Sequence, residues 1–221
     1  DNEFNFVVVL EELQVETGNA DSKHRPQRAT GVALTIAVSL LEGWSNNSGS
    51  RILLFVGGPA TVGQGKVLST NLEESMRSHW DLRNHRAYHY PKAEMFYKGI
   101  EDALVSKGLV LDVFACSLDQ VGIHEMRSAI EASGGLLVLA ETYESDEFRE
   151  SLQRMFALSK EDGRLKMSFN ATLELIASPK VNVTQAFGPC SSLGHKTLLF
   201  PVSRMSGYPS VIVVSWRVAV W

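Results

Sequence analysis

The sequence has few cysteines and no hydrophobic run long enough to form a membrane-spanning helix. Cys116 and Cys190 are its only two cysteines, so it lacks the disulfide framework that small secreted domains need, and we expect both thiols to be reduced. The longest apolar stretches, at 32–41 and 211–221, are shorter than the roughly 18 residues that a membrane helix requires. These absences exclude a disulfide-built secreted domain and a membrane span within these residues.

The sequence also lacks an excess of positive charge. It contains 21 Lys and Arg residues against 25 Asp and Glu residues, for a formal net charge of −4. A nucleic-acid-binding domain shows a strong basic excess, so we expect no nucleic-acid partner. The contents of 44% hydrophobic and 21% charged residues are typical of a globular protein. Because the chain of 221 residues starts at Asp1 rather than at Met, we expect it to be a piece of a longer protein.

Expected strands and helices alternate along the first three quarters of the chain. Short apolar runs that favour buried strands lie at 51–56, 109–115 and 136–140. Longer segments that favour helices lie at 3–13, 29–41, 93–106, 121–132 and 145–157. This alternation is typical of an α/β fold with a doubly wound, mostly parallel sheet.

The pattern changes near residue 160. Apolar residues alternate with polar or small ones in 166–178, which favours a half-buried antiparallel strand. Further strand-like runs without helical period follow at 181–187, 197–202 and 211–221. The sequence therefore predicts an α/β domain over 1–160 and a β-rich unit over 161–221.

A glycine-rich loop at 57–66 follows the first expected strand and has to be tested as a phosphate site. A Walker loop requires glycine where this chain has Ala60, and a hydroxyl residue where it has Val67. Pro59 interrupts the turn into a helix that a dinucleotide site needs. We therefore interpret the loop as a structural turn, in which a positive φ at Gly57 or Gly58 would make a side chain costly.

No set of residues forms a recognisable catalytic or metal motif. Asp112 and Asp119 do not form the Asp-x-Ser-x-Ser string of an integrin-type metal site. Cys116 follows an apolar strand and is expected to be buried, and Cys190 has no evident base beside it. We expect neither a catalytic residue nor a bound metal.

A basic and aromatic segment stands out at 83–90. His85 and His89 are four residues apart and could share one face of a helix, but they lack the third ligand of a zinc site. Arg83 lies just before His85, and Arg86 lies between the two histidines. We interpret Arg83, His85, Arg86 and His89 as a solvent-exposed segment that binds a partner.

Several strings, in this order, resemble one family: 28–34 (RATGVAL), 51–61 (RILLFVGGPAT), 77–82 (RSHWDL), 112–122 (DVFACSLDQVG) and 188–190 (GPC). They are similar to the central part of the COPII vesicle-coat inner subunit, the GTPase-activating member of the Sec23/Sec24 family. The basic residues after Leu82 and the string 170–174 (NATLE) depart from the usual family pattern, which indicates a divergent paralogue.

The resemblance implies a von Willebrand A-like trunk domain followed by part of an antiparallel β-sandwich. It also implies two partners, the coat small GTPase in its GTP form and the sister cargo-binding subunit, and a peripheral place on the cytosolic face of the endoplasmic reticulum membrane and on COPII-coated vesicles. The family's zinc finger and the gelsolin-like region with its arginine finger have no counterpart in these residues. We therefore expect neither a cofactor nor an enzymatic or GTPase-activating function of this segment alone.

Two hypotheses of different classes remain. The first is a coat scaffold that acts in transport from the endoplasmic reticulum to the Golgi by binding other proteins. The second is an α/β enzyme or ligand-binding domain with its site at the carboxyl ends of the strands, where such folds bind ligands. Residues 57–66 and 116–120 would then line the crevice.

Overall fold

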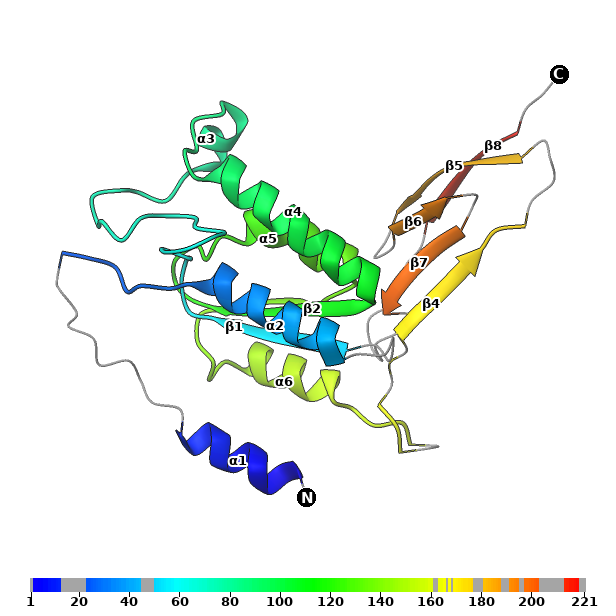
Figure 1. Cartoon of the computed structure of the whole chain (residues 1–221), viewed down its shortest axis with the longest axis horizontal. Helices are drawn as coiled ribbons and strands as arrows, with labels where there is room; N and C mark the ends of the chain where they lie inside the picture. Colours follow the sequence, from blue (N-terminus) through cyan, green and yellow to red (C-terminus); the bar gives the residue numbers. More distant parts are fainter. Residues whose placement is uncertain are drawn as a thin grey trace.

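The computed structural model describes residues 2–12, 23–44, 50–160, 163–165, 167, 169–176, 181–187, 191–194, 197–202 and 213–218. Its helices are α1 (Asn2–Glu12), α2 (Thr30–Trp44), α3 (His79–Arg83), α4 (Tyr90–Lys107), α5 (Ile123–Ala132) and α6 (Asp146–Met155) (Figure 1). Its strands are β1 (Ser50–Val56), β2 (Leu109–Cys116), β3 (Leu137–Ala140), β4 (Phe169–Glu174), β5 (Val181–Phe187), β6 (Ser191–Gly194), β7 (Thr197–Val202) and β8 (Val213–Val218).

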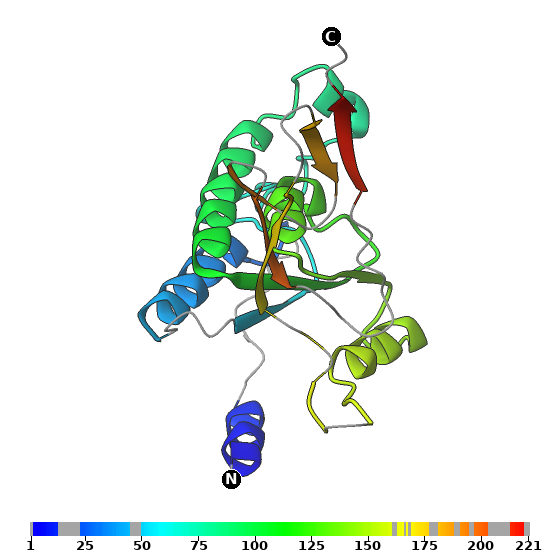
Figure 2. The ribbon, with the colours of Figure 1, turned by 90° about the vertical axis from the view of Figure 1, so that its right-hand side faces the viewer.

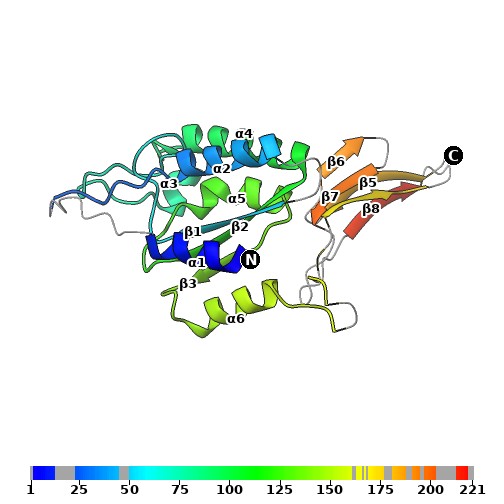
Figure 3. The ribbon, with the colours of Figure 1, turned by 60° about the horizontal axis from the view of Figure 1, so that its bottom comes forward.

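A parallel three-stranded sheet forms the centre of the α/β part. Its order is β1-β2-β3, with Ile52 of β1 opposite Leu111 of β2, and Phe114 of β2 opposite Val138 of β3. Helices α2, α4 and α5 lie on one side of this sheet and α6 lies on the other (Figure 3). The predicted α/β fold with helices on both faces is therefore confirmed.

The hydrophobic core has two parts because β2 is buried on both faces. On one face, Leu111 and Val113 pack in a large cluster with Leu34 of α2, Leu104 of α4 and Met126 of α5. On the other face, a smaller cluster consists of Phe114, Val138 and Met155, with Phe148 of α6 packed against it. A parallel strand covered on both sides reads as a continuous apolar run, which is why 109–115 was recognisable in the sequence.

One charged residue interrupts the apolar run of β2. Asp112 is 0% exposed, and its carboxylate accepts hydrogen bonds from Arg51 Nε at 2.7 Å, from Arg51 Nη2 at 2.5 Å and from the backbone N–H of Leu136 at 2.7 Å. Arg51 belongs to β1, and Leu136 directly precedes β3. The buried carboxylate therefore joins all three strands of the sheet.

The strands after residue 160 are antiparallel, as expected for part of a β-sandwich. They form one sheet in the order β4-β7-β6 and a second sheet of β5 and β8. Figure 2 shows them in front of the parallel sheet, and Figure 1 places them beyond the end at which β1 and β2 begin. The boundary at 160–161 itself stays a prediction, and Cys190 lies outside the described residues.

None of the described helices is long and apolar enough to cross a membrane.

The glycines of the loop after β1 differ from expectation, because neither Gly57 nor Gly58 has a positive φ. A Cβ on Gly58 would instead come within 2.8 Å of the Arg28 guanidinium, which is the mobile end of a long side chain. The expectation that one of these two glycines adopts a positive φ was therefore wrong.

A different glycine allows the loop after β1 to approach a helix. A Cβ on Gly31 of α2 would lie 2.1 Å from the carbonyl oxygen of Gln64. We expect Gly31→Ala to lower the free energy of unfolding by about 1–3 kcal/mol, because the loop has to move away from the helix. Gly43, on the same helix, has no atom within 4 Å of such a Cβ. Gly43→Ala should therefore leave stability unchanged or raise it by up to about 1 kcal/mol. Urea unfolding of both variants tests this, and equal effects would contradict it.

Candidate partner-binding surface at the carboxyl edge of the sheet

The crevice at the carboxyl ends of the strands is filled by the chain itself. After β1, the loop turns back over the sheet edge and buries Ala60, Thr61, Val67 and Leu68. A Cβ on Gly122, at φ +89°, would come within 2.6 Å of the Val67 side chain, so the loop also packs closely against the start of α5. The loop therefore covers the strand ends themselves, which disfavours the enzyme hypothesis, and the open space beside residues 63–66 is lined by α4 and by no strand residue.

This loop is joined to the segment before α2. The Thr61 hydroxyl donates to the carbonyl of Pro26 at 2.8 Å and accepts from the N–H of Arg28 at 2.8 Å. Further along, the Arg25 guanidinium donates to the carbonyls of Asn71 and Glu74, the latter at 2.8 Å, and the Arg25 N–H donates to Thr70 at 2.7 Å. Residues 24–28 thereby hold residues 60–74 in place along their length.

The second segment proposed for an enzyme crevice contains no acid–base pair. Burial raises the pKa of the Cys116 thiol, which opposes formation of a nucleophilic thiolate. Ser117 uses its hydroxyl locally, as acceptor of the Asp119 N–H at 3.2 Å. Among the residues that the structure describes, no group of three or more His, Cys, Asp or Glu side chains is placed to hold a metal ion.

A buried ion pair fixes the segment that carries α3. Arg77 donates from Nε to Oε1 of Glu125 at 2.7 Å and from Nη2 to Oε2 at 2.5 Å, while Nη1 donates to Gln120 Oε1 at 2.9 Å. The side chains of Arg77 and Glu125 are only 9% and 1% exposed. The pair anchors the start of the segment on α5, and sequence reasoning missed it because the partners are 48 residues apart.

Helix α3 is short but well capped. The Ser78 hydroxyl accepts from the Asp81 N–H, while the Asp81 carboxylate accepts from the Ser78 N–H at 2.8 Å, which together form a capping box. The Ser78 hydroxyl also donates to the Asp81 carboxylate at 2.6 Å, and this bond, followed by the one from the Ser78 N–H, lowers the pKa of the Asp81 carboxyl. The string Ser-His-Trp-Asp could have revealed this start signal, although the helix has only five residues.

The structure places three of the four predicted partner-binding residues in solvent. Arg83, His85 and Arg86 are exposed, and the guanidinium of Arg86 lies 4.7 Å above the centre of the Trp80 ring, a cation–π contact. We call Trp80, Arg83, His85 and Arg86 the basic-aromatic surface. The suggestion that His85 and His89 share a helix face was wrong, because His85 has a φ of 54° and lies between α3 and α4.

His89 faces inward and has a different environment. It is the N-cap residue of α4, its side chain is 18% exposed, and its Nε2 lies 3.3 Å from Oε1 of Glu74. Burial lowers the pKa of His89, and the charges of Lys66 and Lys92 lower it further, against the opposing effect of Glu74. For Glu74, burial is outweighed by hydrogen bonds from Ser69 and by the nearby positive charges, so the pKa of its carboxyl is lowered.

Comparison with known proteins identifies relatives along most of the chain. Residues 2–156 match the family model of the Sec23/Sec24 trunk domain. Two Arabidopsis thaliana proteins, named protein transport protein SEC23 F and protein transport protein SEC23 C, are 44% and 43% identical over 196 residues, or 88% and 89% of this chain. The chain spans about a quarter of these relatives, at 25% and 26% of their lengths.

A solved structure shows the same fold at low sequence identity. The human COPII-coat protein Sec24c matches with a TM-score of 0.59 and 12% identity, over 91% of this chain and 26% of the other. At that identity the similarity concerns the fold alone, and it agrees with the von Willebrand A-like architecture inferred from the sequence.

The environment of His89 predicts a pH effect on stability. Because the pKa of His89 is lower in the folded chain than its ordinary value of 6.5, the folded chain binds fewer protons than the unfolded chain just below that pH. Stability should therefore fall as the pH drops through 6.5. In His89→Gln this fall should be smaller, whereas the exposed control His85→Asn should retain it. Urea unfolding at pH 7.5 and 5.5 measures the effect, and an unchanged fall in His89→Gln would contradict it.

Proposed function

The chain belongs to the Sec23/Sec24 trunk-domain family, and we propose on this premise that it is the trunk part of a COPII coat subunit. In this role it is a scaffold for protein contacts, which binds the coat small GTPase in its GTP form and the sister cargo-binding subunit. It would act on the cytosolic face of the endoplasmic reticulum membrane and on COPII-coated vesicles, as a peripheral component without a cofactor of its own.

The observation that carries this proposal is the match of the whole α/β part to the trunk-domain family. The match starts in α1 and ends one residue after α6, so it includes every element of the parallel sheet and its helices. Both plant relatives are named protein transport proteins. The filled crevice at the strand ends also supports a scaffold rather than an enzyme.

We propose that the basic-aromatic surface contacts one of the two protein partners. Its exposed cations stand on a rigid support, because the Arg77–Glu125 ion pair lies at its start and the capping box orders α3. Trp80 adds an exposed apolar ring beneath Arg86. Tryptophan and arginine are the residue types that most often dominate the binding energy of protein interfaces.

A charge-reversal variant tests this surface. We expect Arg83→Glu combined with Arg86→Glu to weaken binding of the GTP-loaded coat GTPase or of the sister subunit at least tenfold, because both cations leave the interface and two like charges enter it. The matched control is Arg149→Glu with Lys160→Glu, which changes the formal charge equally at exposed positions elsewhere. Binding is measured by surface plasmon resonance with each partner at 50 and 150 mM salt, and circular dichroism checks the fold.

Two outcomes would contradict the proposal in different ways. If the unmodified chain binds neither partner, the assignment as a coat scaffold fails. If it binds but both double variants lose affinity equally, the scaffold stands and the basic-aromatic surface is not the contact.

The chain alone should bind the coat GTPase without accelerating it. An arginine supplied in trans raises GTP hydrolysis by about 10³–10⁵ by neutralising charge in the transition state, and no arginine here corresponds to the family's finger. Single-turnover hydrolysis with saturating chain should therefore stay within a few-fold of the intrinsic rate. A full-length family member serves as the positive control. A hundredfold acceleration by this chain would show that one of its own arginines acts as the finger.

A further inference from the structure

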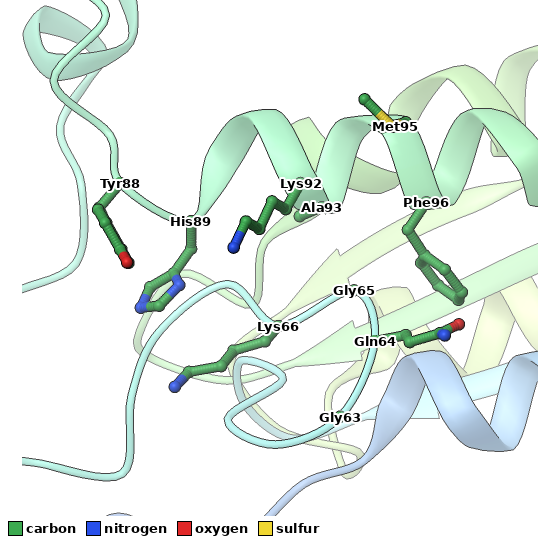
Figure 4. A pocket seen from close by; sticks show the side chains of 10 residues that line it. All are labelled: Gly63, Gln64, Gly65, Lys66, Tyr88, His89, Lys92, Ala93, Met95 and Phe96. Carbon is green, nitrogen blue, oxygen red and sulfur yellow. The ribbon is translucent and has the colours of Figure 1, made fainter.

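A preformed cavity lies beside the basic-aromatic surface, between the loop after β1 and the first turns of α4. Its volume is about 610 Å³. The loop contributes Gly63, Gln64, Gly65 and Lys66, and the remaining lining residues are Tyr88, His89, Lys92, Ala93, Met95 and Phe96. Figure 4 shows Lys66, His89, Lys92 and Phe96 around the space between the loop and the helix, whereas Met95 points away from the loop.

The lining of the cavity is positively charged and contains no carboxylate. It includes two lysines and a histidine, and no Asp or Glu. The charges of Lys66 and Lys92 both act on His89, so all three groups share one electrostatic environment. Lys66 also acts on Glu74 at longer range, but neither lysine forms an ion pair within the part of the chain that the structure describes. Because the pKa of His89 is lowered below 6.5 and its Nε2 lies 3.3 Å from Glu74 Oε1, the positive charge of the lining at pH 7 comes from the two lysines. A bound anion would reduce the repulsion between Lys66 and Lys92.

The cavity has a polar end and an aromatic end. In Figure 4, Lys66, His89 and Lys92 gather on the side where α4 begins, whereas Phe96 lies at the other side above Gln64. Phe96 is half-buried and its ring packs edge-on against Tyr97, with centroids 5.1 Å apart. The two ends therefore suit a ligand that has a negative group and an apolar ring next to each other.

The loop wall of the cavity is held in place. Gly63 and Gly65 have φ values of 77° and 71°, and a Cβ on Gly65 would come within 2.8 Å of the Phe96 ring. The buried Tyr97 hydroxyl donates to the carbonyl of Gly65 at 3.4 Å. A site that is already formed loses little conformational entropy when a ligand binds.

We propose that this cavity binds a short acidic segment of a partner protein, with a carboxylate between Lys66 and Lys92 and an adjacent aromatic ring against Phe96. The volume favours this ligand over a single inorganic anion, because it falls in the range of about 300–1,000 Å³ that holds drug-sized ligands. The aromatic end favours it over a bare lipid headgroup. The site lies next to the basic-aromatic surface, with Tyr88 and His89 between them.

The experiment uses defined peptides, so it does not depend on either coat partner. The probe is a fluorescein-labelled hexapeptide that contains two Glu-Phe repeats, and the matched probes replace Glu by Gln or Phe by Ala. We expect the Glu-Phe peptide to bind at least tenfold more tightly than either matched probe in fluorescence anisotropy. In amide NMR spectra of the chain, the largest shifts should occur at Gly63, Gly65 and Ala93.

Charge-matched variants of the chain locate the site. Lys66→Gln with Lys92→Gln should weaken peptide binding at least tenfold. Lys98→Gln with Lys107→Gln removes the same charge from α4 outside the cavity and should leave the affinity within twofold. Phosphatidylserine vesicles form a separate arm of the experiment.

Each contrary result overturns the proposal. Peptide binding that does not saturate at millimolar concentration excludes the site. Equal binding of the Gln peptide, or equal losses in the two double variants, would show non-specific attraction. Vesicle binding that depends on Lys66 and Lys92, without peptide binding, would assign the cavity to an anionic lipid surface instead.

Discussion

Asp112 lies at the centre of the sheet, where a carboxylate without partners would be strongly unfavourable. Its charge is satisfied by Arg51 on one neighbouring strand and by the Leu136 N–H before the other. A buried ion pair adds little net stability over an apolar pair, but removal of one partner typically costs about 3–5 kcal/mol. These contacts therefore favour a single register of the three strands. The loops and helices that follow the strands are positioned by that register.

The candidate binding surfaces depend on this sheet through a second buried charge. Helices α4 and α5 flank β2 in the sequence, and α5 presents Glu125 to Arg77 at the carboxyl edge. That contact positions α3 and the residues that lead back into α4, which in turn supply one wall of the cavity. In the described part of the molecule, the buried ion pairs Arg51–Asp112 and Arg77–Glu125 thus fix the elements that carry polar side chains at the carboxyl edge of the sheet. At the same edge the loop after β1 covers the ends of β1 and β2, where Val56 and Cys116 are buried.

Much of this architecture could be predicted from periodicity, and the rest depends on contacts that periodicity does not contain. The strands 51–56 and 109–115 and the helices α2, α4, α5 and α6 have long, regular apolar patterns, so their prediction was close to the observed bounds. Neither the five-residue α3, which depends on a capping box, nor β6, with the sequence Ser-Ser-Leu-Gly, has a regular apolar pattern. Both were missed for that reason.

The residues of the candidate site were likewise predicted only where local sequence determines their environment. The exposure of Arg83 and Arg86 followed from their polarity, but the inward position of His89 depends on Glu74, which lies fifteen residues away across a loop. The helical relation between His85 and His89 failed because His85 has a left-handed backbone and lies between α3 and α4, so no single helix contains both residues. Gln64 and Phe96 meet only through the fold, so the cavity had no sequence signal. The family itself was recognisable from short strings because these include the loop and the edge residues that the fold brings together.

The contacts between residues 24–28 and 60–74 have a consequence for the dynamics of the molecule. Because Arg25 and Thr61 tie the two segments at several points, neither can open without breaking the hydrogen bonds of the other. They should therefore exchange their amide hydrogens as one cooperative unit, separate from the slower sheet. Glu74 and Lys66 belong to this unit, so a ligand that settles in the neighbouring cavity would slow exchange as far away as Arg25.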